Sequence, residues 1–362
     1  MSLRELDKDG VVAALRGVID AHSGQDVVSL GMLRDLAVCD GNVRVVLQLP
    51  AGDDVTTRRD DLHEQTRTLL AGLPGVRSVD VEFQAPPLAA AGSLPGVKHV
   101  VAVGAGKGGV GKSTVALLLA VGLKRRGLRA GVLDADVYGP SIPKLTGTES
   151  AQPLMDDDGR VIPPRKHGIS IMSMGYFVPP DQAVVWRGPM AQKYVKEFLD
   201  RGAWGELDYL IVDLPPGTGD IPLTLAQSIP LAGAVIVCTP QDVALLDAVK
   251  ALRMYRKLGV DPIGMVENMS FYVCPQCGHR DDLFGHGGAQ QAARELGVPF
   301  LGAIPLNIEI RKNGDAGEPL ANFTAGDGHV ADALEKLVAR FVEETERRAR
   351  QRTPLPQLRV RG

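Results

Sequence analysis

From about residue 99 onward, short apolar runs alternate with segments of helical periodicity. The helical segments include residues 113–127 and 242–259. Continuous apolar strands separated by helices are typical of a parallel sheet that helices cover on both faces. We therefore predict an α/β domain over residues 98–346, with ligands at the carboxyl ends of its strands. The predicted strands span residues 99–104, 129–135, 168–174, 208–214, 233–239, 263–269 and 299–304.

Residues 1–83 have a different pattern, which predicts a small α+β domain. Two apolar runs flank Asp40-Gly41, a strong signal for a β-hairpin. A polar helix over residues 60–73 and a strand over residues 76–83 complete the unit. Cys39, within the hairpin, is predicted to be a buried thiol. The first helix has one apolar face made by Val11, Val12, Leu15, Val18 and Ile19.

Residues 84–97 are rich in Pro, Ala and Gly and show no periodicity, so they are interpreted as a linker. Residues 347–362 form a basic, Pro-containing tail. The last helix has an apolar face that we expect to pack on the domain, made by Leu334, Leu337, Val338, Phe341 and Val342.

Composition narrows the class of protein. A net charge of -3 and 4% aromatic residues argue against a nucleic-acid partner. No apolar run approaches the ~20 residues of a membrane span, and the first ten residues lack the apolar core of a secretory signal. We therefore expect a cytoplasmic protein without a membrane partner. Its four cysteines are too few for a disulfide framework, and Cys238, inside an apolar run, is expected to be a core thiol.

The stretch GAGKGGVGKS, residues 104–113, fits two nucleotide-binding patterns. A dinucleotide fingerprint would use the first glycines and an acid such as Asp134, but it gives no reason for Lys112-Ser113. A phosphate loop beginning at Gly106 explains both residues. Lys112 would neutralise the phosphates, Ser113 would bind magnesium, and Thr114 would lie beside the α-phosphate. The backbone N–H groups that would wrap the β-phosphate belong to Gly108, Gly109, Val110, Gly111 and the two residues that follow.

A second acid favours the phosphate loop. Asp213 ends the apolar strand in LIVDLPPGTGD, where a magnesium acid is expected, and Gly217 in the following turn can bring its N–H to the γ-phosphate. Two further acids, Asp134 and Asp136, follow another strand. We predict that Asp136 positions the attacking water, whereas a capping or turn role is the plainer reading of both.

Two features remain open on residue chemistry alone. The additional Lys107 could reach the phosphates of another subunit or could be a solvated loop charge. Cys274 and Cys277 form a C-x-x-C pair, which is only half of a four-ligand metal site. A symmetric dimer could join two pairs around a 4Fe–4S cluster. Alternatively, His279 and His286 could complete a zinc site in one chain, or the pair could form a redox disulfide.

Several stretches together resemble one family. GKGGVGKS is similar to the deviant phosphate loop of the MinD/Mrp group of dimeric P-loop ATPases. VVWRGPM, LIVDLPPGTGD, VENMSFYVCPQCG and FGHGG resemble the Mrp/ApbC iron–sulfur cluster carriers in order and spacing, from about residue 99 to 319. The front unit resembles the iron–sulfur-assembly domain often fused to them. A cysteine common in that domain is absent from LQLPAGDDVTT.

The resemblance implies an ATP- and magnesium-dependent homodimer that carries a 4Fe–4S cluster to recipient apoproteins, with slow ATP hydrolysis. Lys107 would contact nucleotide across the dimer interface, and Asn268 would hydrogen-bond the adenine. The resemblance also favours an iron–sulfur cluster rather than zinc at Cys274 and Cys277. The alternative is a partitioning-type ATPase switch with structural zinc. A dimer or partner surface, or ordinary core packing, could involve Trp186, Met174 and Phe177. Arg187 could pair with a phosphate or with an acid.

Overall fold

The structure is a computed structural model. It describes residues 8–21, 23–39, 41–48, 55–84, 94–177, 188–217, 219–229, 231–324 and 328–351. The chain divides into two compact units, residues 1–89 and 90–362, each of which is described by itself. Most of the predicted linker lies outside the described residues, although Leu94 already packs in the core of the second unit.

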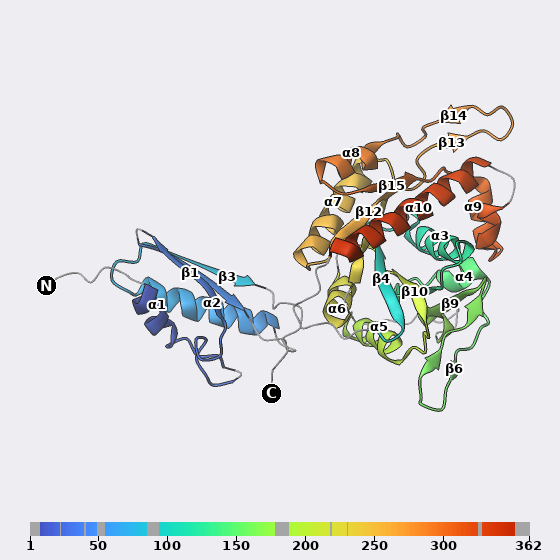
Figure 1. The fold of residues 1–362 in the computed structure, drawn as a ribbon. Coiled ribbons are helices and arrows are strands. Elements are labelled where there is room, and N and C mark those ends of the chain that lie inside the picture. The colour runs from blue at the N-terminus through green and yellow to red at the C-terminus, as the bar shows by residue number, and fades with distance from the viewer. Residues whose placement is uncertain are drawn as a thin grey trace. The chain divides into compact units, whose positions relative to one another are not determined.

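The first unit is a three-stranded sheet with two helices (Figure 1). The middle strand β2 pairs antiparallel with β1 and parallel with β3, which confirms the predicted hairpin. Val43, Val45 and Leu47 alternate along β2 and pack against both helices and the loop after α1. The elements are α1 (Lys8–Leu15), β1 (Leu33–Cys39), β2 (Asn42–Gln48), α2 (Val55–Ala71) and β3 (Ser78–Gln84).

Two details of this unit differ from the sequence prediction. The first helix ends at Leu15 and is followed by a turn in which the Gly17 N–H donates to the carbonyl of Ala14. Ile19 therefore does not share the helical face and is 43% exposed. Cys39 is exposed rather than buried, because strand alternation turns Leu36 inward and Cys39 outward.

The second unit confirms the predicted α/β class. Its eight-stranded sheet has the order β15-β12-β11-β4-β10-β5-β9-β8, and β8 alone pairs antiparallel to its neighbour. Each of the seven predicted strands is present. They are β4 (Val97–Gly104), β5 (Ala130–Asp134), β9 (Ile169–Ser173), β10 (Leu207–Asp213), β11 (Leu231–Cys238), β12 (Pro262–Glu267) and β15 (Phe300–Ala303), joined at the edge by β8 (Arg165–Lys166).

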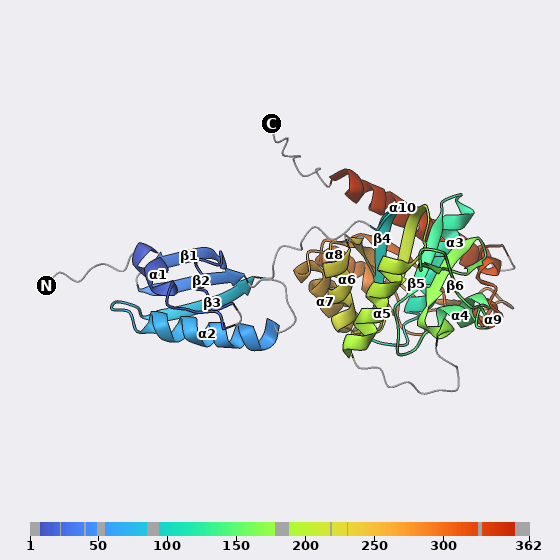
Figure 2. The same ribbon diagram turned by 90° about the horizontal axis from the view of Figure 1, so that it is seen from below.

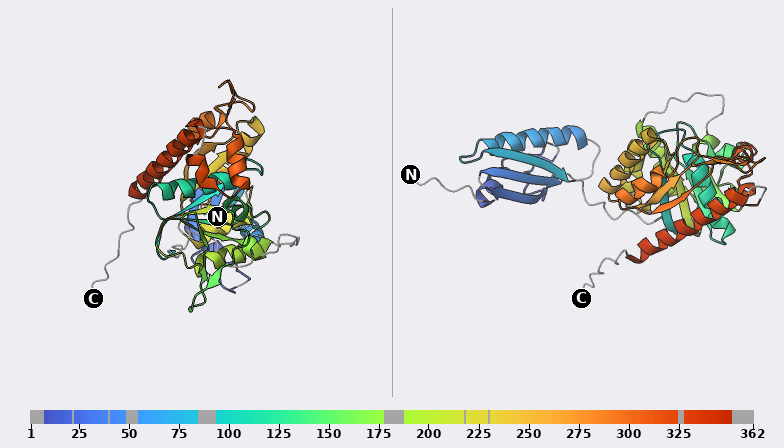
Figure 3. Two further views of the ribbon diagram at one scale, coloured as in Figure 1. Left: turned by 90° about the vertical axis from the view of Figure 1, so that its right-hand side faces the viewer. Right: turned by 90° about the horizontal axis from the view of Figure 1, so that it is seen from above.

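Helices cover both faces of this sheet (Figures 2 and 3). On β4, Val101 and Val103 point to one core, whereas Val100 and Ala102 point to the other. The first core is covered by α3 (Lys112–Arg125) and α10 (Gly328–Gln351), with α4 (Ile142–Thr146) and α9 (Ile308–Asp315) beside them. The second is covered by α5 (Gly188–Arg201), α6 (Asp220–Ser228), α7 (Asp242–Lys257) and α8 (Gly288–Glu295).

The predicted face of the last helix packs on the domain as expected. Leu334, Leu337, Val338 and Phe341 are at most 1% exposed, and the helix continues to Gln351. The prediction did not include two hairpins whose strands are two residues long. They pair β6 (Leu154–Met155) with β7 (Val161–Ile162) and β13 (Tyr272–Val273) with β14 (Arg280–Asp281). It also did not include the 3₁₀ turns at Met174–Tyr176 and Pro319–Phe323. No helix among the described residues is long and apolar enough to cross a bilayer.

Candidate functional site

The glycine-rich stretch connects the carboxyl end of β4 to the amino end of α3. Gly109 and Gly111 have φ of 80° and 81°, a conformation that favours glycine. No side chain caps α3, so the amides at its positive end are available to an anion. They face a cavity of about 290 Å³, lined by Lys107, Gly108, Gly109, Gly111, Lys112, Ser113, Thr114, Asp136, Ser141, Leu145 and Pro216.

Lys112 connects the loop to the acids at the neighbouring strand ends. Its Nζ lies 2.6 Å from Asp213 Oδ1, 3.7 Å from Asp136 Oδ2 and 3.2 Å from Ser113 Oγ. The parallel pairing of β10 with β4 and β5 brings these groups together. Ser141, Leu145 and Pro216 also line the cavity, but no sequence motif singled them out.

The residues around Lys112 fit magnesium. Asp213 is fully buried, and its Oδ2 makes no hydrogen bond within the described part of the chain. An unpartnered buried carboxylate oxygen is costly unless a cation binds it. Burial raises the pKa of Asp213 and of Asp136, and Lys112 opposes both shifts. Ser113 supplies a hydroxyl beside these carboxylates, and oxygen ligands of this kind are those magnesium prefers.

Asp134 has a different environment from Asp136. Its Oδ1 accepts the N–H of Asp136, and its Oδ2 accepts the N–H of Ile142 and the hydroxyl of Ser173. It is fully buried, and this burial, with the nearby charge of Asp213, raises its pKa to about 8. Asp134 therefore anchors the loop that carries Asp136.

Two groups that were predicted to contact nucleotide make hydrogen bonds within the protein in this structure. The N–H of Gly217, a residue with φ of 92°, donates to the carbonyl of Ala105 at 2.9 Å. The side-chain amide of Asn268 donates to the carbonyl of Val110 at 2.8 Å. Contacts of these residues with γ-phosphate and adenine stay predictions.

Gly106 is packed so closely that a Cβ would lie 2.2 Å from the backbone of Asp247.

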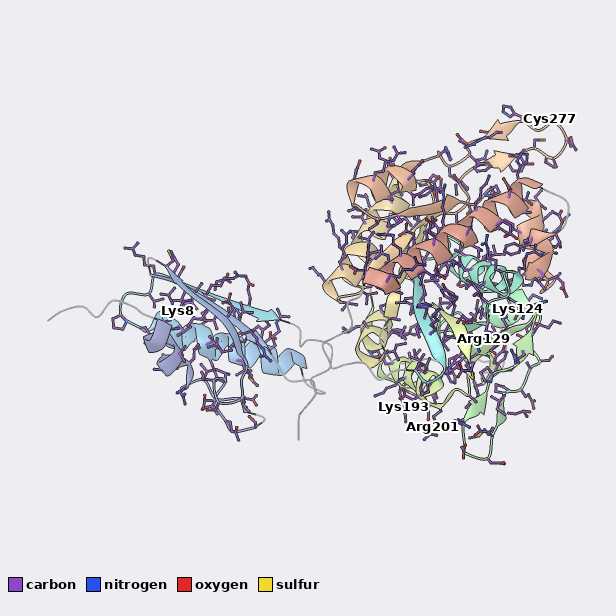
Figure 4. The ribbon with its side chains drawn as sticks, viewed as in Figure 1. Lys8, Lys124, Arg129, Lys193, Arg201 and Cys277 are labelled. Carbon is purple, nitrogen blue, oxygen red and sulfur yellow. The ribbon has the colours of Figure 1, made fainter. Side chains whose placement is uncertain are left out.

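The C-x-x-C pair lies in the loop between β13 and β14. Figure 4 shows Cys277 near the outer end of this hairpin, away from the helices and sheet of the unit. The Cys274 N–H donates to the carbonyl of His279, and its carbonyl accepts the N–H of Gly278. Backbone N–H groups of Cys277 and Gln276 lower the pKa of the Cys274 thiol, which favours the thiolate that binds metal.

The described residues hold no group of three or more His, Cys, Asp and Glu side chains suited to a metal. His279 and His286 therefore do not complete a zinc site with the two cysteines in this chain. His286 instead has its Nδ1 2.7 Å from Ser270 Oγ and 3.5 Å from Glu267 Oε1. The sequence analysis missed Glu267 and Ser270, although an acid at the end of an apolar strand is a usable signal.

The remaining candidates fall into separate environments. Cys238 is buried, as predicted, and burial raises the pKa of its thiol to about 12. Met174 belongs to the core, whereas Phe177 is 48% exposed and stacks on Phe198. Trp186 and Arg187 lie outside the described residues.

Comparisons with known proteins identify the family of each unit. The ParA family, described as NUBPL iron-transfer P-loop NTPase, matches residues 96–342, and a family described as iron-sulfur cluster assembly protein matches residues 8–83. An iron-sulfur cluster carrier protein of Deinococcus radiodurans is 48% identical over 86% of this chain and 88% of its own length. The protein of the same name from Escherichia coli K12 is 42% identical over 85% of this chain and 86% of its own length.

Solved structures show the same fold. A nucleotide-binding protein from Archaeoglobus fulgidus in complex with ADP is 42% identical, has a TM-score of 0.56, and matches over 62% of this chain and 89% of its own. The cell division ATPase MinD of Pyrococcus furiosus has a TM-score of 0.52 at 20% identity, over 68% of this chain and 98% of its own, and supports the fold alone. The predicted resemblance is thus confirmed: the chain belongs to the family of NUBPL iron-transfer P-loop NTPases.

Proposed function

We propose that this protein is an ATP-dependent carrier that receives a 4Fe–4S cluster and delivers it to recipient apoproteins in a reducing cytoplasm. The observation that carries the proposal is the pair of half-buried Cys274 and exposed Cys277, which lacks further metal ligands in the described part of its own chain. A 4Fe–4S cluster takes four thiolates, so two copies related by a two-fold axis would supply one complete set. The names of the relatives support this cargo.

The nucleotide site supports a switch driven by ATP. The N–H groups that begin α3 and the Lys112 ammonium would hold the β- and γ-phosphates. Magnesium would bind Ser113 and Asp213, neutralise phosphate charge, and replace part of the present Lys112–Asp213 contact. Asp136, at the edge of the cavity, would orient the attacking water. Gly217 would exchange its bond to Ala105 for one to the γ-phosphate.

Lys107 supports the homodimer. Its side chain lies at the same cavity as Lys112 but has no charged partner among the described residues, whereas Lys112 contacts two acids. In a nucleotide-bound dimer, Lys107 of one copy would contact the phosphates of the other, as an arginine finger does. ATP binding would thereby change the separation or tilt of the two cysteine pairs and alter the affinity for the cluster.

The cargo is tested by anaerobic reconstitution with iron and sulfide. We expect visible charge-transfer absorption and about four irons per dimer in the wild type, and neither in Cys274→Ser/Cys277→Ser. Cys39→Ser, which removes an exposed thiol in the other unit, is the matched control and should retain the cluster. Stoichiometric zinc without iron uptake, or a monomer that holds a complete cluster, would overturn the proposal.

A further inference from the structure

The segment between β12 and the cysteine hairpin is anchored at both ends. At its start, the Asn268 N–H donates to the carbonyl of Cys238 at 2.8 Å, and its side chain donates to Val110 of the phosphate loop. At its end, the Phe271 carbonyl accepts the N–H of Leu306 at 2.7 Å. Phe271 is three positions after Asn268, which contacts the phosphate loop, and Cys274 is three positions after Phe271.

A buried acid holds the middle of this segment. Glu267 is 0% exposed and accepts the N–H groups of Gly287 and Ala289 at 3.0 and 2.8 Å. It also accepts the Ser270 hydroxyl at 2.5 Å. Between these two side chains, Met269 has a φ of 54°, which is strained for a residue with a Cβ. Such a turn keeps its conformation only while the contacts on both sides persist.

His286 joins this turn to the hairpin. Because the Ser270 hydroxyl donates to Glu267, the Nδ1–H of His286 is the donor to Ser270 Oγ at 2.7 Å. The imidazole also lies 3.5 Å from Glu267 Oε1 and packs edge to face on Phe271, with ring centroids 6.1 Å apart. The guanidinium of Arg280, on strand β14 of the hairpin, lies 4.1 Å from the centroid of the same Phe271 ring.

We propose that His286 is a positioning residue that couples the phosphate loop to the cysteine hairpin. Its Nδ1 holds the Ser270–Glu267 turn, and its ring holds Phe271, on which the hairpin's Arg280 packs. A nucleotide that displaces the Val110 carbonyl shifts Asn268 and this turn, and His286 passes the shift to Cys274 and Cys277. This inference rests on the proposed function, since it assigns the route by which nucleotide regulates the metal-binding thiols.

The test uses thiol reactivity in the full, metal-free, reduced chain carrying Cys39→Ser. Cys238 is 1% exposed, so Cys274 and Cys277 are the reactive thiols. Their rate of reaction with an aromatic disulfide is measured with and without a non-hydrolysable ATP analogue and magnesium. We expect nucleotide to change the rate about fivefold or more, as for a typical coupling between two sites.

Three variants distinguish the role of His286. In His286→Ala, the ratio of the thiol reaction rates with and without nucleotide should fall to about one. The Kd for the analogue should stay within about twofold of the parent value, because His286 lies outside the nucleotide cavity. In His286→Asn, the amide nitrogen replaces Nδ1 as the donor to Ser270, so part of the coupling should return. His279→Ala is the matched control: its side chain is exposed on the same hairpin, and coupling should be retained.

The outcomes separate this inference from the proposed function. A fully retained ratio in His286→Ala overturns the inference and leaves the carrier function intact. Equal loss in His279→Ala and His286→Ala also overturns it, because the coupling would then not depend on the contacts of His286 with Ser270 and Phe271. The absence of any nucleotide effect in the parent chain overturns both the coupling and the proposed switch.

Discussion

At the scale of single residues, the site concentrates acids around one buried ammonium. Lys112 is 7% exposed and lies within 4 Å of Asp213 and Asp136, while Asp134 is buried close enough to Asp213 for the two charges to interact. One lysine does not balance three carboxylates, so bound protons or a divalent metal ion must supply the remaining charge. Burial is the largest cause of the raised pKa values of all three acids, and the charge of a neighbouring carboxylate adds to it at Asp134 and Asp213.

Asp134 should make stability depend on pH. Its pKa rises from 3.8 to about 8 on folding, so the stabilisation from its bound proton is complete below pH 3.8 and is lost as pH rises toward 8. We expect the free energy of unfolding of the magnesium-free protein to fall by at most about 1.4 kcal/mol per pH unit from this group. Denaturant titrations at pH 6 and 7.5 measure the slope, which Asp134→Asn should reduce. The exposed control Asp157→Asn should keep it, and equal slopes in all three proteins would contradict this role.

Gly111 tests how closely Asn268 packs on the phosphate loop. A Cβ at Gly111 would lie 2.2 Å from Asn268 Nδ2, in addition to the strain at φ of 81°. Gly127 has φ of 80° with nothing near its missing Cβ, so Gly127→Ala should cost only about 1–2 kcal/mol. Gly111→Ala should lower stability further and weaken ATP binding, and Asn268→Ala added to it should recover the excess. Equal melting temperatures for Gly111→Ala and Gly127→Ala would show that the contact is absent.

At the scale of elements, α10 is a structural part of the sheet's cover. Its apolar face packs on β15, β12 and β11 and on α3. Phe341 is fully buried with its ring centroid 5.7 Å from that of Tyr209 on the central strand β10. The apolar face of α10 is therefore occupied by the sheet and by α3.

Truncation of this side chain should therefore destabilise the whole second unit. Phe341→Ala should cost about 3–5 kcal/mol, because a large cavity opens against the sheet. Glu343→Ala, two residues along and exposed, should change stability by less than about 0.5 kcal/mol. Guanidinium denaturation followed by circular dichroism measures both. If the two variants have similar midpoints, α10 does not pack as described.

At the scale of the whole molecule, the core of the first unit is separate from the two cores on either face of the second unit's sheet. The core of the first unit contains residues 11–81, and no residue of the second unit belongs to it. The residues that line the nucleotide cavity and the pair Cys274 and Cys277 lie in the second unit. Each unit thus contains the buried apolar side chains that its own folding requires.

A chain that begins at residue 94 should therefore fold and bind nucleotide. We expect its Kd for ATP and its denaturation midpoint to match those of the second unit in the full chain, because Leu94 is the first described core residue of that unit. Isothermal titration and denaturation compare the two proteins. Aggregation of the shorter chain, or a tenfold weaker Kd, would mean that the first unit completes the site.

The fold could be predicted from the sequence because the patterns that indicate strands and turns are local. Apolar runs such as VVAVG and YLIVD and the turn at Asp40-Gly41 need only neighbouring residues to be recognised, and the strands that they predict are present. The same reasoning extended the first helix to Ile19 and buried Cys39, because it does not show where a helix stops or which side of a strand meets the core.

The sequence by itself determined the α/β class, the phosphate loop with Lys112 and Ser113, and the C-x-x-C pair, because each depends on spacing along the chain. Only the tertiary structure decided which groups meet. Asp213 contacts Lys112 across 101 positions of the sequence, and Asn268 contacts Val110 across 158. His286 contacts Ser270 and is not grouped with the two cysteines in the described part of the chain. Such contacts follow from strand order and loop packing, which bring the carboxyl ends of separate strands to one edge of the sheet.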